Sequence, residues 1–353
     1  MHLSNKSVSS EIIYHEVFTA LSSTLLRSIY GYQISGSDDP FLKEAIELVR
    51  NLSDAIMPTN FLVNVFPSLR YIPSWFPGTG WKQTACAWRK QKERAMFSLF
   101  NKTKEAIATG NYEPSMIASS LVNAQSHGLS PEEVDDYLNY AGITVYLGGA
   151  ETTSNVFLIF AIAMMLYPET QRKAQMEIDG LIGDSRLPAM EDKHRLPYTN
   201  RLIQELLRWC PVGPTGKCVP HAATNDDIYR GFRIPKGAIV FANIWAMSRS
   251  EKIYEEPEEF NPDRFLDPLV PPCPVFGFGR RECPGSHFAE SSMFIMIASI
   301  LAVFNVEIPR NAQGEKVIPK LACKNTLIYH PEEFQLKLQP RSDRHTHLVY
   351  TEA

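Results

Sequence analysis

The chain has 353 residues, and its 35 basic and 39 acidic side chains leave a formal net charge of −4. This balance, with a pI near 6.2, excludes nucleic acid and acidic membrane surfaces as main partners. A hydrophobic content of 44% with 21% charged residues is typical of a globular protein and excludes wholesale disorder. At about 150 residues per domain the length suggests two domains, although one large enzyme domain also fits.

The cysteine pattern and the start of the chain bear on the cellular compartment. The six cysteines are too widely spread for a disulfide framework and include no C-x-x-C pair typical of structural zinc. A reducing compartment is therefore expected, and the first ten residues lack the apolar core of a signal peptide. The longest apolar runs fall short of the ~20 residues of a bilayer span, so we expect buried core helices, and no membrane-crossing segment, at 156–167 and 293–304.

The first two-thirds of the chain is predicted to be helical. Apolar residues at helical spacing indicate helices over 11–30, 41–56 and 81–109, with a proline-rich connector at 67–80. Ser130, Pro131 and Glu133 form a helix start with a capping box. No proline interrupts the pattern before Pro168, which at ~1.5 Å per residue gives a helix of roughly 55 Å. Two shorter helices are expected to follow, over 168–180 and 197–209.

The pattern changes after Pro211. Short strands joined by glycine and proline turns are predicted over 227–241, followed by an irregular stretch at 255–284. Loops of that length are uncommon unless they are functional or ordered by something they wrap. An apolar helix is expected over 285–304, then strand-like pieces to residue 338 and a polar tail over 341–353. The sequence therefore predicts a mainly α fold with small β-sheets.

A glycine- and arginine-rich segment from Phe276 to Gly285 carries Cys283 directly before the apolar helix. A cysteine near a helix N-terminus faces unsatisfied N–H groups, which lower a thiol pKa and favour metal ligation. The glycines allow the backbone to approach a flat group, and Arg281 can reach an anion. Taken alone, a Gly-x-x-x-Cys string is more often a free buried cysteine beside a turn.

Two further patterns carry possible chemistry. Gly148 and Gly149 lie inside the long helix, where each glycine costs about 1 kcal/mol relative to alanine. The Thr152 hydroxyl can bond the carbonyl four residues back and loosen the helix beside Glu151, although close helix packing would also explain the glycines.

The other pattern is Glu205-x-x-Arg208, which places opposite charges on one helical face. Such pairs are abundant on protein surfaces and contribute little there. The apolar flanking residues suggest burial of this pair, and Arg264 could complete a three-member network.

Together these segments resemble the cytochrome P450 family, whose haem-binding loop F-x-x-G-x-R-x-C-x-G is matched at every fixed position by 276–285. Residues 148–153 resemble its [AG]-G-x-[DE]-T-[TS] motif, and Glu205, Arg208 and Arg264 its E-x-x-R and P-[ED]-R-F motifs. The resemblance implies a single cytochrome P450-like domain over 1–353. It consists of a helical front part (1–120), a haem- and oxygen-binding core (130–340) and a polar tail (341–353). The family's anchor, early sheet and W-x-x-x-R helix have no counterpart, so we expect the fold to lack its N-terminal part.

The resemblance also implies roles for individual residues. Cys283 is expected to be the axial thiolate of haem iron, with Arg281 on a propionate and Phe276 beneath the porphyrin. Thr152 would hydrogen-bond dioxygen, Glu151 would feed protons inward, and Glu205, Arg208 and Arg264 would lock the thiolate loop. Gly279 and Gly285 belong to the cofactor-binding loop, and His221 either touches a propionate or is an ordinary histidine. The residues expected to line the substrate pocket are Ala150, Val212, Thr215, Asn325 and Thr326.

The function implied is that of a haem-thiolate monooxygenase acting on a lipophilic small molecule. It would use haem b, O2 and electrons from NADPH through a separate cytochrome P450 reductase. Residues 29–32, 38–40 and 73–78 look like fungal secondary-metabolism members of the O-methylsterigmatocystin oxidoreductase-like type. The resemblance implies a place at the endoplasmic reticulum membrane; we expect a monomer, and this chain itself would be cytosolic or peripheral. The alternatives are an inactive, truncated remnant that does not hold haem productively, and a haem-thiolate isomerase or peroxygenase, against which Glu151 and Thr152 argue.

Overall fold

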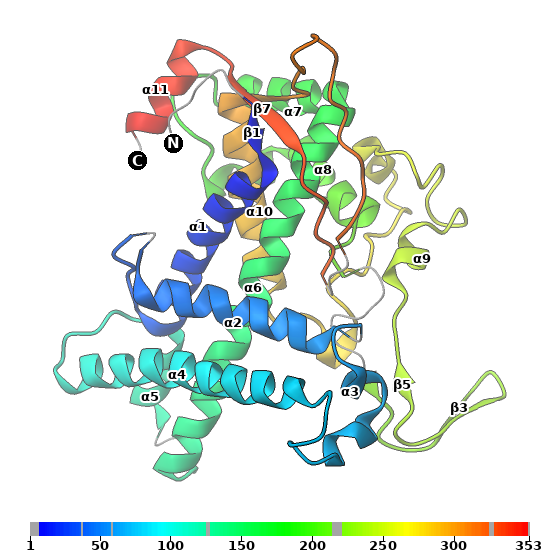
Figure 1. Cartoon of the computed structure of the whole chain (residues 1–353). Coiled ribbons are helices and arrows are strands. Elements are labelled where there is room, and N and C mark those ends of the chain that lie inside the picture. Colours follow the sequence, from blue (N-terminus) through cyan, green and yellow to red (C-terminus); the bar gives the residue numbers. More distant parts are fainter. Residues whose placement is uncertain are drawn as a thin grey trace. The chain divides into compact units, whose positions relative to one another are not determined.

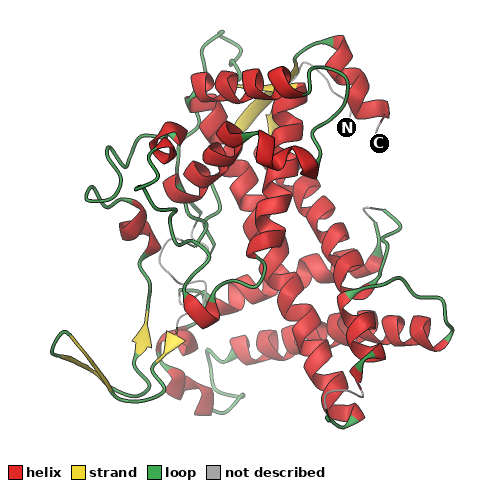
Figure 2. Cartoon of the chain, turned by 180° about the vertical axis from the view of Figure 1, so that it is seen from behind, coloured by secondary structure: helices red, strands yellow, loops and turns green. Residues whose placement is uncertain are grey.

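The computed structural model describes residues 7–36, 38–57, 59–124, 128–213, 221–324 and 328–351. Helices make up most of it, and strands occupy only short pieces, as predicted (Figure 2). The chain divides into two compact units, one formed by 15–154 and the other by 1–14 with 155–353. The assignment of a single domain to 1–353 stays a prediction.

The unit of residues 15–154 is built from helices, of which the four longest match the predicted ones closely and the three short ones were not predicted. Its helix α2 packs along α4 (Figure 1). The helices are α1 (Ser10–Tyr30), α2 (Pro40–Ile56), α3 (Leu62–Val65), η1 (Pro67–Tyr71), α4 (Gly80–Ala108), α5 (Met116–Val122) and α6 (Pro131–Leu166). The start of α1 and the end of α6 belong to the other unit.

Side chains at the helix starts explain why these helices begin where they do. Asp39 caps α2, because its Oδ1 accepts the N–H groups of Phe41 at 2.9 Å and Leu42 at 3.2 Å. The predicted capping box of α6 is confirmed: Ser130 Oγ accepts the Glu133 N–H, and Glu133 Oε2 accepts the Ser130 N–H. These caps satisfy N–H groups that the helices themselves leave unpaired.

Close packing in this unit depends on Gly142 of α6. A Cβ built at this position would lie 2.6 Å from the hydroxyl and 2.9 Å from Cζ of Tyr30, the last residue of α1. Tyr30 is 3% exposed, and burial raises its pKa well above the usual range. The glycine is therefore required by the tyrosine ring that fills the space beside it.

In the other unit, 1–14 with 155–353, the described residues combine helices with three small antiparallel sheets. Its remaining helices are α7 (Pro168–Leu181), η3 (Met190–Arg195), α8 (Pro197–Trp209), α9 (Ile244–Ser248), η4 (Pro262–Leu266), η5 (Gly279–Arg281), α10 (Ser286–Val303) and α11 (Asp343–Thr351). The strand order is β1-β7-β6 in the first sheet, β2-β5 in the second and β3-β4 in the third. The strands are β1 (Val8–Ser9), β2 (His221–Ala222), β3 (Asp227–Tyr229), β4 (Phe232–Ile234), β5 (Ile239–Val240), β6 (Phe304–Glu307) and β7 (Gln335–Pro340).

The end of the chain differs from the prediction. Within the predicted polar tail, residues 343–351 form α11, a helix that was not predicted, and Arg341 beside it pairs with Asp179 at the end of α7. The strand β1 was not predicted either, because its two residues carry no alternation that could be recognised. It pairs with β7, with Val8 opposite Leu336. Both features depend on partners far away in sequence.

The two long apolar runs lie in α6 and α10, whose bounds match the helices predicted there. By length and composition, α6 and α10 could each cross a membrane. Length and composition alone do not overturn the expectation of buried core helices at these apolar runs. The apolar window of α6 is 78% buried inside the protein, as in the core helix of a soluble protein, which passes the same test.

Candidate functional site

The segment from Phe276 to Gly285 forms a closed loop that leads into α10. The backbone N–H of Cys283 donates to the carbonyl of Phe276 over 2.7 Å and closes the loop. Gly277 and Gly279 adopt φ values of +87° and +56°, in the left-handed region that favours glycine. The glycines of this segment therefore set the path that brings the cysteine to the helix start.

The Cys283 thiol lies on the exposed surface of this loop. All residues from 277 to 284 are exposed. At Gly285 a Cβ would come within 3.8 Å of the sulfur, so the glycine leaves that side of the sulfur uncovered. By contrast, burial raises the pKa of Cys210 to about 12 and that of Cys273 to about 11, and neither thiol can reach an external ligand.

The residues of the loop fit a haem held by one sulfur. A thiolate is a soft ligand suited to iron, and exposed glycines beside it leave room for a flat macrocycle. Arg281 is exposed on the same loop and can reach a propionate. Within the described ranges, no three His, Cys, Asp or Glu residues gather as a metal site.

The two glycines of α6 have different surroundings. A Cβ at Gly149 would lie 2.9 Å from Cδ1 of Leu25 on α1, so this glycine permits close helix packing. At Gly148 a Cβ would meet nothing within 4 Å. The Gly148 carbonyl accepts the hydroxyl of Thr152 at 2.9 Å, the bond predicted from their spacing. The helix nevertheless continues unbroken through this point.

Glu151 is partly buried beside these residues and contacts α2. Its Oε2 accepts the hydroxyl of Ser53 at 2.9 Å. Burial raises the pKa of the Glu151 carboxyl; the Ser53 hydrogen bond lowers it in part, and the charge of Asp54 raises it further. Glu151 thus holds its proton to higher pH than an exposed glutamate, which suits a proton donor.

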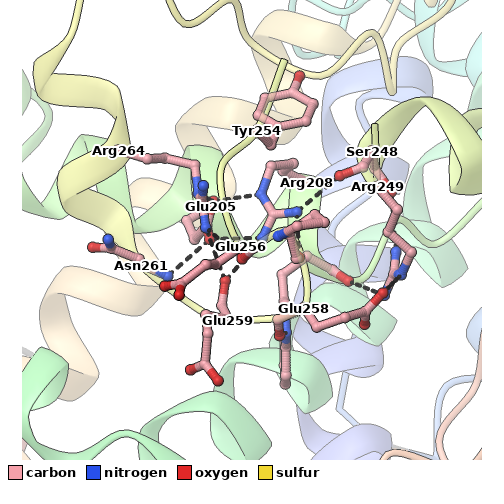
Figure 3. A network of polar contacts seen from close by, with 12 residues as sticks. Glu205, Arg208, Ser248, Arg249, Tyr254, Glu256, Glu258, Glu259, Asn261 and Arg264 are labelled. Atoms are coloured by element: carbon pink, nitrogen blue, oxygen red, sulfur yellow. Dashed lines mark hydrogen bonds and ion pairs between the residues drawn. The ribbon is translucent and has the colours of Figure 1, made fainter. Parts of the chain in front are cut away.

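The pair Glu205 and Arg208 of α8 is completely buried, with both side chains 0% exposed. Arg208 donates to the two carboxylate oxygens at 2.7 and 2.8 Å, and Arg264 Nε reaches the same oxygens at 3.1 and 3.2 Å (Figure 3). The predicted three-member network is therefore formed. Asn261 adds a backbone N–H to Glu205 at 2.8 Å.

The same side chains order the irregular segment that follows α9. Five consecutive carbonyls, those of residues 255 to 259, accept hydrogen bonds from Arg208, Trp209 or Arg264 (Figure 3). Arg208 also donates to the carbonyl of Ser248 at 2.8 Å. The first part of the stretch predicted to be irregular is thus wrapped around two arginines and one indole.

The remaining predicted site residues are scattered. His221 is exposed on β2 opposite Val240, and Val212 is half-buried, with its carbonyl accepting the Tyr329 N–H at 2.8 Å. Ala150 is fully buried, and its carbonyl accepts the Ser154 hydroxyl. Thr215, Asn325 and Thr326 lie outside the described residues. Their roles toward haem or substrate stay predictions.

The two halves of the predicted site fall in different units. Cys283 and the arginine network belong to the unit of 155–353, whereas Glu151 and Thr152 belong to that of 15–154.

The sequence did not predict Ser53 as a site residue, because its partner lies 98 residues away and no motif spacing marks a serine within a helix. It also missed Trp209 as a member of the arginine network, although this residue directly follows Arg208.

The loop cysteine, the buried Glu-x-x-Arg network and the acid–alcohol pair are the features in which the sequence resembles the cytochrome P450 family, and comparison with known proteins shows that family. The family model "Cytochrome P450" matches residues 4–338. The chain belongs to the cytochrome P450 family.

The relatives are fungal. A cytochrome P450 monooxygenase of Armillaria gallica is 38% identical over 332 residues, covering 92% of this chain and 64% of that protein. Cytochrome P450 monooxygenase 58 of Postia placenta is 36% identical over 337 residues, covering 92% of this chain and 62% of the relative. The chain thus spans somewhat under two-thirds of the length of these relatives.

A solved structure gives the fold. A zebra fish cytochrome P450 structure with abiraterone superposes with a TM-score of 0.77 over 96% of this chain and 73% of the other. The two sequences are 23% identical, so this likeness concerns the fold alone.

Proposed function

We propose that the protein is a haem-thiolate monooxygenase that inserts one oxygen atom of O2 into a lipophilic small molecule, in fungal secondary metabolism. The observation that carries this proposal is the exposed Cys283 thiol on a glycine-shaped loop before α10. Bound through that sulfur, haem b supplies the oxygen-activating chemistry, with electrons from NADPH through a separate reductase. Arg281 would hold a propionate, with Phe276, Gly279 and Gly285 forming the bed of the cofactor.

Glu151 and Thr152 would deliver protons to the reaction. A threonine hydroxyl both donates and accepts hydrogen bonds, so Thr152 can accept a proton on its oxygen while releasing the one now held on the Gly148 carbonyl. Glu151 carries a carboxyl whose pKa burial has raised, which supports a role as the source of that proton. The network of Glu205, Arg208 and Arg264 would act structurally, by holding the chain around the thiolate loop.

The test of the haem site uses the thiolate signature in the absorption spectrum. The full chain is expressed, supplied with haem, reduced and exposed to carbon monoxide. We expect a strongly red-shifted Soret band that is lost in Cys283→Ala and kept in Cys86→Ala, a matched change at another exposed free cysteine. If the wild-type chain gave no such band, the alternative of an inactive protein would replace this proposal.

The proton-relay role is tested separately, by product analysis. Thr152→Ala should lower product formation while hydrogen peroxide release rises, because reduced oxygen then leaves without being used. An unchanged yield of product would refute the role of Thr152 and would favour the isomerase or peroxygenase alternative.

We further propose that the protein acts at the endoplasmic reticulum membrane. Apolar and aromatic side chains are exposed along residues 62–75, including Leu62 at 71%, Tyr71 at 74% and Trp75 at 82%. Tryptophan and tyrosine favour the membrane interface, where one end is apolar and the other wet. In a flotation assay with neutral lipid vesicles, Trp75→Ser should reduce the bound fraction, whereas equal binding of both proteins would contradict this placement.

A further inference from the structure

Glu151 is held by a residue outside its own helix. The Ser53 hydroxyl, one turn before the end of α2, donates to Glu151 Oε2 over 2.9 Å. The two residues are 98 positions apart in sequence. A serine hydroxyl that donates to a carboxylate makes a charge-assisted hydrogen bond, which is short and directional. This contact therefore limits which way the Glu151 carboxyl can face.

The next residue of α2 acts on the same carboxyl in the opposite sense. Asp54 is exposed, and its negative charge disfavours ionisation of Glu151, whereas the Ser53 hydrogen bond favours it. Two adjacent residues at the end of α2 thus act against one another on one proton-carrying group. The group itself lies next to Thr152, whose hydroxyl is held on the Gly148 carbonyl.

We propose that Ser53 is a positioning residue for proton delivery: it fixes the orientation of the Glu151 carboxyl from α2. This inference rests on the proposed function, in which Glu151 supplies the proton. It makes the end of α2 part of the machinery, although no motif there indicates chemistry. The placement of α2 is itself defined, because Asp39 caps its start and the helix packs along α4.

The inference is tested first by titrating Glu151 in the full chain. The infrared band of the protonated carboxyl is followed against pH and assigned by its absence in Glu151→Gln. Ser53→Ala should shift the titration to higher pH, because the hydrogen bond that favours the carboxylate is lost, and Ser53→Thr should restore it. Asp54→Asn should shift the titration to lower pH. Ser98→Ala, which removes a serine hydroxyl bonded to a backbone carbonyl of α4, should leave the titration unchanged.

The second measurement is the ratio of hydrogen peroxide to product in the haem-loaded enzyme. We expect this ratio to rise severalfold in Ser53→Ala and to return to the wild-type value in Ser53→Thr. An unshifted titration in Ser53→Ala would overturn the inference, as would a peroxide ratio that Ser53→Thr does not rescue. A different result would separate this inference from the proposed function. If Glu151→Gln changed neither hydrogen peroxide release nor product formation, the relay role of Glu151 would be refuted, even if Ser53→Ala shifted the titration of Glu151. Should Ser53→Ala fold poorly, Ser53→Cys, whose S–H is a weaker donor, carries the same expectation and the same refutation, while Asp54→Asn checks only that the assigned band responds to a nearby charge.

Discussion

Changing Glu205 to glutamine removes one charge from the centre of a buried network and keeps the shape of the side chain. The carboxylate accepts two hydrogen bonds from Arg208, two from Arg264 and one from the Asn261 N–H. In Glu205→Gln one oxygen becomes an NH2 group that faces guanidinium donors. Two arginines, 0% and 6% exposed, then lack their counter-charge.

The expected cost follows from this burial. Removing one partner of a buried ion pair lowers the free energy of unfolding by about 3–5 kcal/mol, because the remaining charge is left uncompensated away from water. The chain offers a matched control in Glu169 and Arg172, which share the same Glu-x-x-Arg spacing but have side chains 79% and 60% exposed. Glu169→Gln should cost about 0.5 kcal/mol or less.

The assay is urea unfolding followed by tryptophan fluorescence. Trp209 is a useful reporter because its indole N–H donates to the Glu258 carbonyl inside the same network, at 2.9 Å. The midpoint of Glu205→Gln should fall well below that of the wild type, with that of Glu169→Gln almost unmoved. Equal midpoints for the two variants would refute the argument that the stability contribution of a Glu-x-x-Arg pair depends on its burial and not on its spacing.

Two further predictions concern the unit of residues 15–154. Gly142→Ala should lower the free energy of unfolding by about 1–3 kcal/mol, because the added Cβ overlaps the Tyr30 ring. Gly148→Ala should raise it by about 1 kcal/mol, because a Cβ there meets open space. Thermal unfolding in which both variants changed the stability in the same direction would contradict this. Asp39 is buried, which alone would raise its pKa, but N–H and hydroxyl donors, the Ser35 N–H first, lower it to about 2. The ionised Asp39 side chain therefore contributes to the free energy of unfolding above pH about 4, and this contribution is lost as the pH falls through about 2. Asp39→Asn keeps the helix cap, so the stability of this variant should depend less on pH in the acid range.

Local patterns were sufficient wherever neighbours in sequence decide the structure. The start of α6 follows from Ser130 and Glu133, which satisfy each other's backbone N–H groups. The bond from Thr152 to Gly148 follows from helical spacing alone. The loop before α10 was recognisable because its glycines and its cysteine stand at fixed offsets within ten residues.

Other features could not be foreseen because distant segments decide them. Glu205 and Arg208 have the same spacing as Glu169 and Arg172, and only the packed structure separates the buried pair from the exposed one. Likewise, Gly148 and Gly149 are neighbours in the same helix, yet Leu25 packs against Gly149 and leaves Gly148 open. The contact of Ser53 with Glu151 depends on how α2 packs, which no short motif encodes.

The arginine network has a consequence for how this protein can change over evolutionary time. Arg208, Trp209 and Arg264 reach the main chain of residues 255–259, and every residue type supplies a carbonyl there. Apart from Glu258, whose carboxylate pairs with Arg249 at 3.1 Å, the segment is held through its main chain and not through its side chains. Glu256, with φ of +43°, is the position where glycine or asparagine would even relieve the backbone. Substitutions along 255–259, Glu258 excepted, should therefore cost little stability, whereas changes to the three side chains that bind this main chain should cost more.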